Sequence, residues 1–333
     1  MTTVENSNSP LEHTAVDVAL PSGSRLPKPE QRLPARVAAI VTVIPALGFL
    51  AACAEVITRR VSAFELEVGA AMYALTIIGV EVGFHRIIAH RGASARSVPR
   101  LVLLVLGSMS AQGPLAWWVA THRRHHERSD REGDPHSPHL FAGKPLSGWS
   151  GFWHAHLGWM WREPAELDWS RYTRDILRDR VLFFVHRSYF LWVALGLALP
   201  AAVGFWHSGR EGLLGALLWG GLVRMFLVHN AMWCVASVCH LYGSRPYEIA
   251  GDHSRNVAWL ALFTFGESWH NNHHAFPSSV RHGLEWWQLD LNYLVIRALS
   301  LLRCVEGIKC PSRASQRSRR RLSPAALANQ VGQ

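Results

Sequence analysis

The sequence predicts an all-α membrane protein, with four transmembrane helices and a cytoplasmic helical cap that holds a histidine-rich site for two metal ions. Three observations predict this fold class. Hydrophobic residues make up 49% of the 333 residues and gather in blocks long enough to cross a bilayer. The formal charge is +10, with arginines gathered near both ends of the chain. Histidines recur at metal-ligand spacing beside the apolar blocks.

The basic ends of the chain predict the orientation. Residues 1–34 are polar and rich in proline, and we expect a disordered cytoplasmic tail there. Arginines recur in residues 306–333, which we expect to form a basic C-terminal tail. The positive-inside rule then places both termini in the cytoplasm. Because the basic run has no base-reading module beside it, we expect anionic membrane lipid as its partner and no nucleic acid.

Two pairs of apolar blocks are expected to cross the membrane. The first pair is residues 37–57 and 68–84, and the second pair is residues 181–205 and 212–235. The length of each block lies within the roughly 17–25 residues that a crossing needs, and each pair returns the chain to its starting side. These four blocks are the predicted transmembrane helices.

Residues 101–120 are apolar as well, but we expect an interfacial helix there. Candidate metal ligands flank this block on both sides, and a crossing would separate them by a bilayer. Gln112, Gly113 and Pro114 also interrupt the block. We expect the same interfacial placement for residues 289–303, where apolar and basic residues alternate at helical spacing.

Nine histidines form the candidate metal site. The pattern HxxHH occurs twice, and its three imidazoles at i, i+3 and i+4 project from one side of a helix. A pair spaced HxxxxH and one isolated histidine after the last span complete the set: His85, His90, His122, His125, His126, His240, His270, His273 and His274. Two ions with four or five nitrogens each suit iron, whereas one tetrahedral zinc would leave most of these imidazoles unused.

His85 and His90 lie five residues apart, about 140° around an ideal helix. Either the helix ends or distorts between them, or one of them is not a ligand; we expect distortion. The remaining histidines do not recur at ligand spacing, and we expect ordinary roles for them: His136, His139, His154, His156, His186, His207, His229, His253 and His282.

Metal-bound imidazoles need acceptors for their second ring nitrogen. Glu81, Asp134 and Glu267 are the candidates, because each lies close in sequence to a candidate ligand; Glu267 is the strongest of the three. The alternative is that they only offset nearby arginines. The five cysteines show no CxxC spacing, so we expect no iron–sulfur cluster.

The pair His85 and His90, together with the triplets at 122–126 and 270–274, resembles the histidine boxes of the membrane fatty acyl desaturases. The likeness is to the stearoyl-CoA (delta-9) desaturase type and covers roughly residues 35–305. It implies a four-span membrane domain with a non-haem di-iron centre that uses O₂ to insert a double bond into a long acyl chain. It also implies that one iron is held by His85, His90, His122, His125 and His273, and the other by His126, His240, His270 and His274.

Two positions depart from the family pattern. Members commonly carry Asn four residues before the isolated histidine, where it orients a water; here the residue is Ala236. Animal members carry Arg-Asp before the middle box to help hold the CoA head group, where this chain has Ala120 and Thr121. Acyl-CoA remains the favoured carrier, with acyl carrier protein and intact phospholipid as alternatives.

The resemblance implies an oxidoreductase that desaturates a long-chain acyl substrate near the delta-9 position. The chain lacks flavin, nicotinamide and iron–sulfur motifs, so we expect an external ferredoxin or cytochrome b5-like donor with its reductase. A di-iron lipid hydroxylase or acetylenase remains an alternative, as does a non-catalytic membrane metal or lipid sensor, which Ala236 favours. We expect a multi-pass protein of the bacterial inner membrane with its active site in the cytoplasm.

Overall fold

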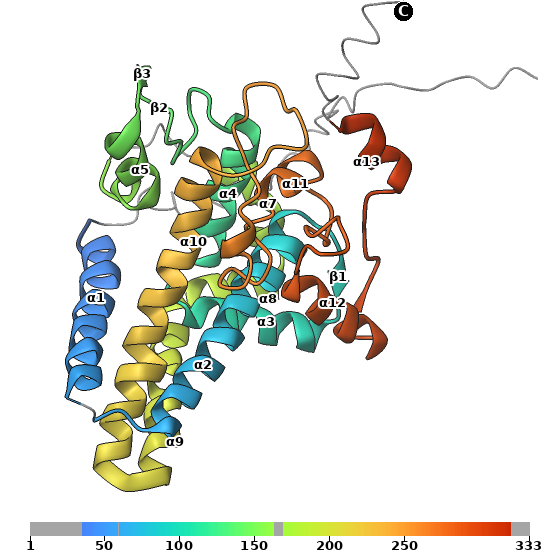
Figure 1. Ribbon diagram of the computed structural model, residues 1–333. Helices are drawn as coiled ribbons and strands as arrows, with labels where there is room; N and C mark the ends of the chain where they lie inside the picture. The colour runs from blue at the N-terminus through green and yellow to red at the C-terminus, as the bar shows by residue number, and fades with distance from the viewer. Residues whose placement is uncertain (1–34, 59, 163–168, 321–333) are drawn as a thin grey trace, which may run out of the picture. The chain divides into compact units, whose positions relative to one another are not determined.

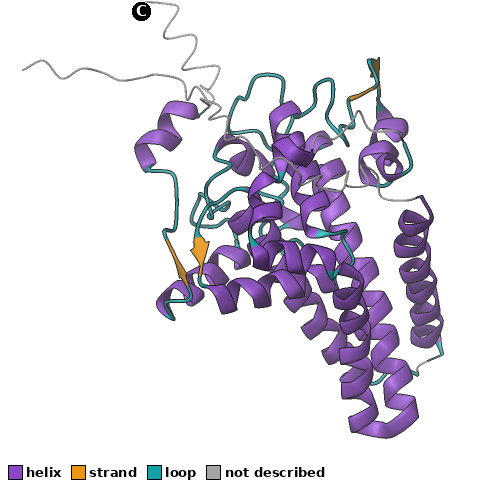
Figure 2. Cartoon of the chain, turned by 180° about the vertical axis from the view of Figure 1, so that it is seen from behind, coloured by secondary structure: helices purple, strands orange, loops and turns teal. Residues whose placement is uncertain are grey.

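The computed structural model describes residues 35–58, 60–162 and 169–320, which form a nearly all-helical unit (Figure 1). The expected tail at residues 1–34 lies outside the described residues. Figure 2 shows helices throughout and small strand pairings at the periphery. The strand pairs are β1 (Ser94–Ala95) with β4 (Val305–Glu306), and β2 (Leu140–Phe141) with β3 (Lys144–Pro145).

The described helical elements follow in chain order. They are α1 (Ala35–Ile57), α2 (Ala63–Ile78), the π-helix η1 (Gly79–Ala89), α3 (Ser97–Met109), α4 (Leu115–Arg128), α5 (Gly148–His156), the 3₁₀ turn η2 (Gly158–Met160), α6 (Trp169–Tyr172), α7 (Arg174–Arg178), α8 (Arg180–Arg187), α9 (Tyr189–Ala216), the π-helix η3 (Leu217–Val223), α10 (Arg224–Leu241), the 3₁₀ turn η4 (Ala258–Leu260), α11 (His270–Ala275), α12 (Leu291–Leu301) and α13 (Arg313–Arg319).

Three helical segments in the described part of the chain are long and apolar enough to cross a membrane. They are Arg36–Ile57, Ala63–Ala89 and Tyr189–Leu241. The third has 53 residues, more than twice the length that one crossing needs. It reverses direction at Ser208 and Gly209, which leave the helical region of backbone space. Three segments of membrane-spanning length are therefore present, and the third folds into a helical hairpin.

The hairpin is closed by backbone contact between its two arms. A Cβ atom at Gly204 would lie 2.0 Å from the carbonyl oxygen of Gly212, so a side chain at this position would force the arms apart. Gly209 has a φ of +65°, a conformation in which glycine is favoured because it has no Cβ. These glycines allow the tight reversal visible at the far end of α9 in Figure 1.

The expected third span begins later than the sequence predicts. Residues 181–187 belong to α8, a separate short helix that starts after Asp179. The Asp179 side chain accepts hydrogen bonds from the backbone N–H groups of Val181 and Leu182, which caps this helix. The long apolar helix α9 then starts at Tyr189. The end of α8 at Ser188, rather than hydropathy, sets the start of the long apolar helix.

The apolar block 101–120 is divided between two helices. The chain turns between α3 and α4, where Ala111 and Gly113 both have positive φ values of 61° and 107°. Pro114 then precedes the first residue of α4. The interruption predicted at this turn is present, and α4 carries the middle histidine box into the core.

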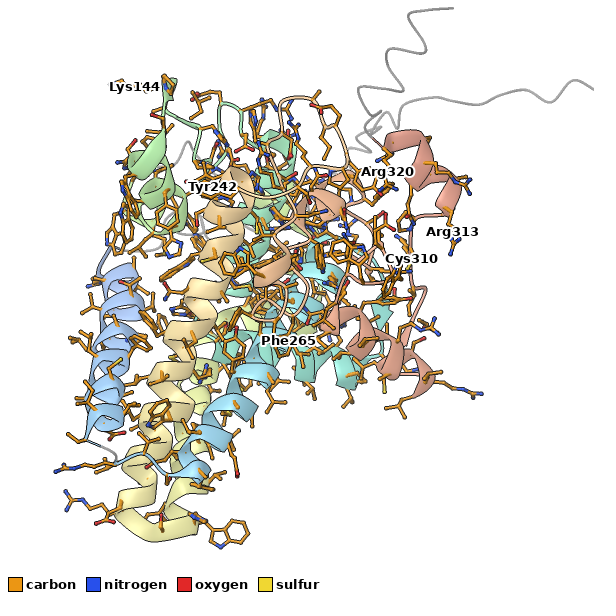
Figure 3. The ribbon with its side chains drawn as sticks, in the orientation of Figure 1. Lys144, Tyr242, Phe265, Cys310, Arg313 and Arg320 are labelled. Carbon is orange, nitrogen blue, oxygen red and sulfur yellow. The ribbon has the colours of Figure 1, made fainter. Side chains whose placement is uncertain are left out.

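The first part of the expected basic tail is folded onto the protein. Beyond β4, the backbone N–H of Val280 donates to the carbonyl of Lys309, and the N–H of Lys309 donates to the carbonyl of Gly92. An Arg319 guanidinium N–H donates to the carbonyl of Ala275. Figure 3 shows Arg313 and Arg320 beside α13 at the outside of the molecule. The segment up to Arg320 is thus attached next to the histidine boxes by hydrogen bonds that the charge pattern does not reveal.

Candidate metal centre

A π-helix brings His85 and His90 together. The backbone N–H of His90 donates to the carbonyl of His85 at 3.0 Å, a contact between residues five apart. Residues five apart therefore lie on nearly the same face, and the two ring centroids are 4.7 Å apart. The distortion predicted between these histidines is confirmed.

The first histidine group joins three parts of the chain. His85 and His90 come from η1 and its end, His122 and His126 from α4, and His273 from α11; their ligand nitrogens all lie within 4.8 Å of one another. The Nε2 atoms of His90 and His122 are 2.6 Å apart. Those of His85 and His273 are 3.2 Å apart, and those of His126 and His273 are 2.9 Å apart.

The second group is more deeply enclosed. His125, His240, His270 and His274 are all buried, and their ligand atoms also lie within 4.8 Å of one another. The Nε2 atoms of His240 and His270 are 3.1 Å apart. Nε2 of His125 and Nε2 of His274 are buried without a hydrogen-bond partner among the described residues. Such orphaned nitrogens in a ring of imidazoles are expected where the ligand is a metal ion rather than a protein group.

The spatial grouping differs from the division implied by the family resemblance. That division puts His125 with the first ion and His126 with the second, whereas the structure places His126 in the first group and His125 in the second. Neighbouring residues on a helix point about 100° apart, so the two rings must face different sides of α4. The ring of His126 faces His90 at 4.5 Å, and that of His125 faces His240 at 5.0 Å.

Both groups fit a transition metal. For ligands about 2.1 Å from one ion and at right angles, two nitrogens lie about 3 Å apart, which matches the observed Nε2 separations. Imidazole donors without a coordinating thiolate suit metals such as iron, copper or zinc. The two groups can therefore each hold one ion.

Aspartates orient the second group. Nδ1 of His125 lies 3.0 Å from both oxygens of Asp134, as the sequence predicts. Nδ1 of His240 lies 2.8 Å from Asp130, and Nδ1 of His274 lies 2.5 Å from Asp252. The last two carboxylates were not expected from the sequence. Asp252 is twelve residues beyond His240 in a loop, where spacing carries no signal.

The charge state of these aspartates follows from their surroundings. Burial raises the pKa of the Asp252 carboxyl, but the facing His274 ring outweighs burial and holds the pKa well below its usual range. At Asp130, burial likewise acts upward while His240 lowers the pKa to well below the usual range. Ionised aspartates fix each ring with its Nε2 lone pair free to bind metal, because Nδ1 keeps the proton.

Glutamates and a further histidine surround the first group. Nδ1 of His85 lies 3.1 Å from Glu81 and 3.3 Å from Glu267. The sequence suggested His270 as the partner of Glu267. The carboxylate of Glu267 contacts His85 and His282 instead, and it lies 3.1 Å from Nδ1 of His282. His282, which we expected to be ordinary, is fully buried, and its ring lies 4.4 Å from that of His273.

A buried arginine completes this side. Arg86 is fully buried and lies 3.5 Å from Glu267, while its other terminal nitrogen donates to Asp290 at 2.9 Å. Burial raises the pKa of Glu267, but His282 and His85 together hold it well below its usual range. Arg86 lies directly after a candidate ligand. Its contacts with Glu267 and Asp290 could not be predicted, because arginines are common in this basic sequence.

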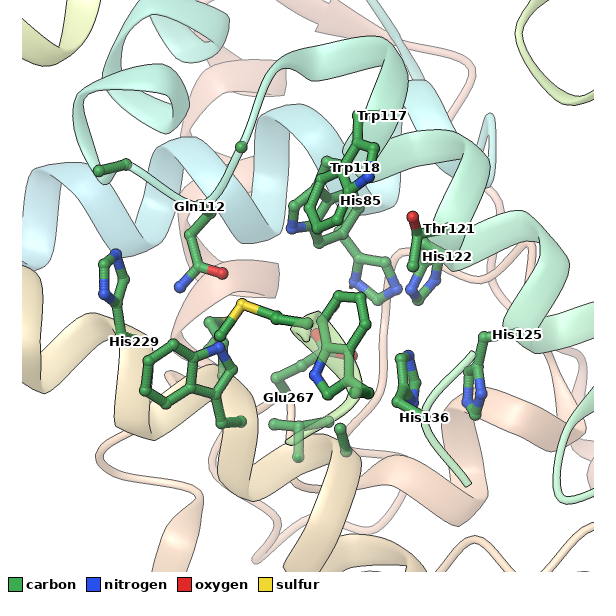
Figure 4. Close-up of a pocket in the computed structure, with 18 of the residues that line it drawn as sticks. His85, Gln112, Trp117, Trp118, Thr121, His122, His125, His136, His229 and Glu267 are labelled. Atoms are coloured by element: carbon green, nitrogen blue, oxygen red, sulfur yellow. Dashed lines mark ion pairs between the residues drawn. The ribbon is translucent and has the colours of Figure 1, made fainter. Parts of the chain in front are cut away.

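An apolar cavity ends at both histidine groups. Figure 4 shows His122 and His125 at one side of this cavity and Gln112 and His229 at the other. The cavity encloses about 970 Å³ of empty space, including the solvent at its opening. Aromatic and thioether side chains form much of its wall: Trp117, Trp118, Trp159, Trp233, Met160 and Met232. Such a lining suits a ligand without polar groups.

Ala236 and His136 both line this cavity. Ala236 lies one helical turn before His240, and its methyl side chain cannot form a hydrogen bond in the cavity. The ring of His136 lies 4.4 Å from that of His125, although the sequence indicated no special role for it.

Helices of membrane-spanning length and two imidazole groups that could each hold a metal ion, both at the wall of an apolar cavity, define the class of membrane-type proteins with a histidine-rich metal site. Residues 66–304 match the model of the fatty acid desaturase family, so the chain belongs to this family. The resemblance seen in the histidine boxes is thereby confirmed, and the protein is an oxidoreductase of the fatty acid desaturases.

Several relatives of established function support the same family. A hex-5-enoyl-[acyl-carrier protein] acetylenase of Moorena producens is 41% identical over 276 residues, 82% of this chain and 85% of the relative. An sn-1 stearoyl-lipid 9-desaturase of Synechocystis is 41% identical over 236 residues, 70% of this chain and 68% of the relative. An acyl-CoA C20 Delta5-desaturase of Anemone leveillei is 35% identical over 251 residues, 74% of each chain.

Proposed function

We propose that the protein uses O₂ to desaturate a long-chain fatty acyl substrate near the delta-9 position, with one iron ion in each histidine group. The observation that carries this proposal is the position of both groups at the wall of one apolar cavity. A saturated acyl chain has no polar group near the reacting carbons. The walls of the cavity must therefore be rigid and must position the chain against the histidine groups. The 9-desaturase relative supports the delta-9 position.

Iron bound in the two groups supplies the activation of O₂ that removal of hydrogen from two adjacent methylenes requires. The chain's own residues hold the site in shape. Asp130, Asp134 and Asp252 fix three rings of the second group, and Glu81 and Glu267 fix His85 in the first. These carboxylates keep Nδ1 protonated, which leaves Nε2 as the ligand atom.

The aromatic wall positions the acyl chain and excludes water. Trp118 stacks on His122 with ring centroids 5.1 Å apart and an interplanar angle of 16°. Trp117 stacks on Trp159 at 5.7 Å. Trp118 thus places a broad apolar surface directly beside the first group, and Trp159 lies beside His136, which adjoins the second group. One methylene of misfit in such a cavity is worth about 1–3 kcal/mol, so its shape selects the reacting carbons.

The proposal also covers the membrane topology, the electron donor and the acyl carrier. The long third segment acts as two spans, giving four in all, with the histidine groups and both termini in the cytoplasm of a bacterial cell. A ferredoxin or cytochrome b5-like protein with its reductase supplies electrons. The departure at Ala120 and Thr121 leaves acyl-CoA, favoured by the family resemblance, alongside acyl carrier protein and lipid as carriers. The three relatives described above are named for acyl carrier protein, lipid and acyl-CoA substrates, respectively.

The experiment is expression in cells followed by mass spectrometry of fatty-acid methyl esters. We expect a new monounsaturated acid whose double bond lies near carbon 9. His270→Ala serves as the matched inactive variant, because it removes one candidate ligand from a buried group. Unchanged fatty acids from iron-loaded protein with a working electron donor would contradict the proposal.

An acetylenase is the second candidate. Its support is the Moorena producens relative, whose similarity extends over 85% of that protein. The same site would then act on an acyl chain that already has a double bond. Supplying hexenoyl and stearoyl substrates side by side separates the two, because a triple bond forms with loss of two further hydrogens and a distinct product mass.

A further inference from the structure

The apolar cavity is not equally enclosed on all sides. Ala111, Tyr189 and His229, which line it away from the histidine groups, are only 4%, 3% and 2% exposed. Val41 of α1 and Met160 of η2 line it too and are partly exposed, as are Gln112 and the tryptophans of the wall. The cavity is therefore closed at Ala111, Tyr189 and His229, and the side formed by α1 and η2 is among its more open ones.

This open side lies against a helix of membrane-spanning length. Val41 belongs to the segment Arg36–Ile57, which is apolar enough to cross a bilayer. Further along α1, packing is tight: a Cβ atom at Gly48 would lie 2.4 Å from Cβ of Leu222, and Phe49 stacks on Phe226 at 4.4 Å. α1 is thus sealed against η3 and α10 in its middle, whereas at Val41 its neighbour is the cavity.

Exposed tryptophans surround the same side. Trp149 and Trp153 of α5 are 73% and 52% exposed, and Trp161, directly after η2, is 43% exposed. Figure 1 shows α5 beyond the N-terminal end of α1. Tryptophan is enriched where a membrane protein meets the boundary between head groups and acyl chains. These side chains are therefore suited to contact lipid at the level of the opening.

The charge of the cavity wall bears on the choice of carrier. Among the described residues, no lysine or arginine lines the cavity. CoA and phosphopantetheine carry phosphate groups, which proteins commonly bind with Arg or Lys. Arg162 follows the last of the tryptophans, but it lies over the ring of Phe141, outside the cavity wall. The lining suits an acyl tail whose charged head group remains in the membrane interface.

From this geometry we infer that Val41, Met160 and Trp233 frame a lateral entrance through which the acyl tail of a glycerolipid passes from the bilayer into the cavity. The inference rests on the proposed desaturase function and names its substrate class. A lipid tail that enters beside α1 meets Trp159 and Trp233 first and then the histidine groups, while its ester and head group stay outside.

The test compares two tryptophan substitutions on the same helix. Val41→Trp places a bulky side chain in the entrance, whereas Val43→Trp changes a residue that is 52% exposed and does not line the cavity. Full-length, iron-loaded protein is placed in nanodiscs of stearoyl-oleoyl phosphatidylglycerol with a reduced ferredoxin, its reductase and O₂. Stearoyl-CoA and stearoyl-acyl carrier protein are offered separately in nanodiscs of unreactive lipid.

We expect wild-type protein to desaturate the phospholipid-bound stearoyl chain. Val41→Trp should lower this rate at least about tenfold, since overfilled apolar sites are poorly tolerated, while Val43→Trp stays within about twofold of wild type. Iron content should be the same in all three proteins. Equal rates for the two variants, or turnover of CoA or carrier-protein substrates without turnover of lipid, would overturn the lateral entrance and leave the proposed function standing.

A measurement that needs no turnover tests the lateral entrance separately from the desaturase function. A phosphatidylglycerol with a diazirine near the end of one acyl chain is photolysed in the nanodisc, and labelled peptides are identified by mass spectrometry. We expect labelling of the peptides that contain Ala111 or His229, at the inner side of the cavity, in wild type and Val43→Trp, and its loss in Val41→Trp. Absence of this label in wild type would overturn the entrance; presence of the label without turnover of any carrier would overturn the desaturase function alone.

Discussion

The second histidine group is surrounded by aspartates, whereas in the first group, among the described residues, carboxylates face the ring of His85 alone. Three of the four rings in the second group thus have an ionic partner at Nδ1. The first group instead depends on a π-helix and on close contacts between rings. One group is oriented by charge, the other by backbone distortion and packing.

This difference indicates which substitutions should disturb the rings of each group. A ring held by a buried carboxylate loses both its orientation and its tautomer when the carboxylate is removed. A ring held by backbone geometry changes only when the helix changes. Substitution of acidic residues should therefore affect the second group more than the first.

The largest effect is expected from paired ligand substitutions, which test the membership of the groups. His122→Ala with His126→Ala removes two ligands from the first group and should leave about half of the iron, because the second group is intact. His122→Ala with His125→Ala damages both groups and should leave almost none. Iron per chain, measured by mass spectrometry on purified protein, checks both variants.

His207→Ala is the control for these pairs, since His207 stacks on Phe64 and belongs to neither group. If the His122 and His125 pair kept half of the iron while the His122 and His126 pair lost nearly all, the division implied by the family resemblance would replace the one seen in the structure.

Removal of a single carboxylate should have the next largest effect. Asp252→Asn leaves His274 without its ionic partner and should weaken retention of one iron by about 10–100-fold. Glu81→Gln should do less, because Glu267 remains 3.3 Å from the same nitrogen of His85. Competition with a chelator at fixed pH measures both. A stronger effect of Glu81→Gln than of Asp252→Asn would break the proposed contrast between the groups.

His282→Gln should affect the first group moderately. The change removes one of the buried partners of Glu267 but leaves His85 and Arg86 in contact with it. We expect a loss of about 1–3 kcal/mol in stability, as for an unsatisfied buried polar group. Mössbauer spectra of iron-57 protein should show a change in one iron signal only. A change confined to the unfolding temperature would assign His282 to packing alone.

The smallest effect is expected at a clamp outside both groups. Asp175 accepts from Arg123 at 2.9 Å and from Arg91 at 2.7 Å, and so joins the residues beside two histidine boxes. Burial raises the pKa of Asp175, but hydrogen bonds and charge from the arginines lower it to about 2. Because the carboxyl is partly exposed, we expect Asp175→Asn to cost less than about 1 kcal/mol.

The pH dependence of this clamp has a defined sign. The folded pKa lies below the unfolded value of about 3.9, so the stabilisation is complete above pH 4 and is lost as the pH falls through about 2. The difference in unfolding temperature between wild type and Asp175→Asn should therefore be constant from pH 8 to 5 and shrink in stronger acid. A difference that grows in acid would contradict this assignment.

Much of the site could be predicted because its signals are local. The HxxHH spacing places three imidazoles on one side of a helix, and this depends only on helix periodicity. The interruption at Gly113 and the distortion between His85 and His90 are likewise short-range. The family follows from the same boxes, and the family match bears it out.

The partners of the rings could not be predicted in the same way. Asp130 meets His240 across 110 positions of the chain, and His282 meets His85 through Glu267. Such contacts depend on how α4, α10 and the loop after α11 pack together. Hydropathy also did not predict that α8 is separate from the long apolar helix α9. Asp179 ends α7 and caps the start of α8, and α9 begins only at Tyr189.

Residue types and their local spacing indicate the kind of chemistry, because the imidazole boxes and apolar blocks of the desaturase family can be read from short stretches of the chain. The packing of the helices determines which group each histidine joins, since His125 and His126 are neighbours on α4 whose rings point about 100° apart and so belong to different groups. The physical reason is that ligand type is fixed by composition, whereas ligand direction is fixed by the packing of helices far apart in the chain.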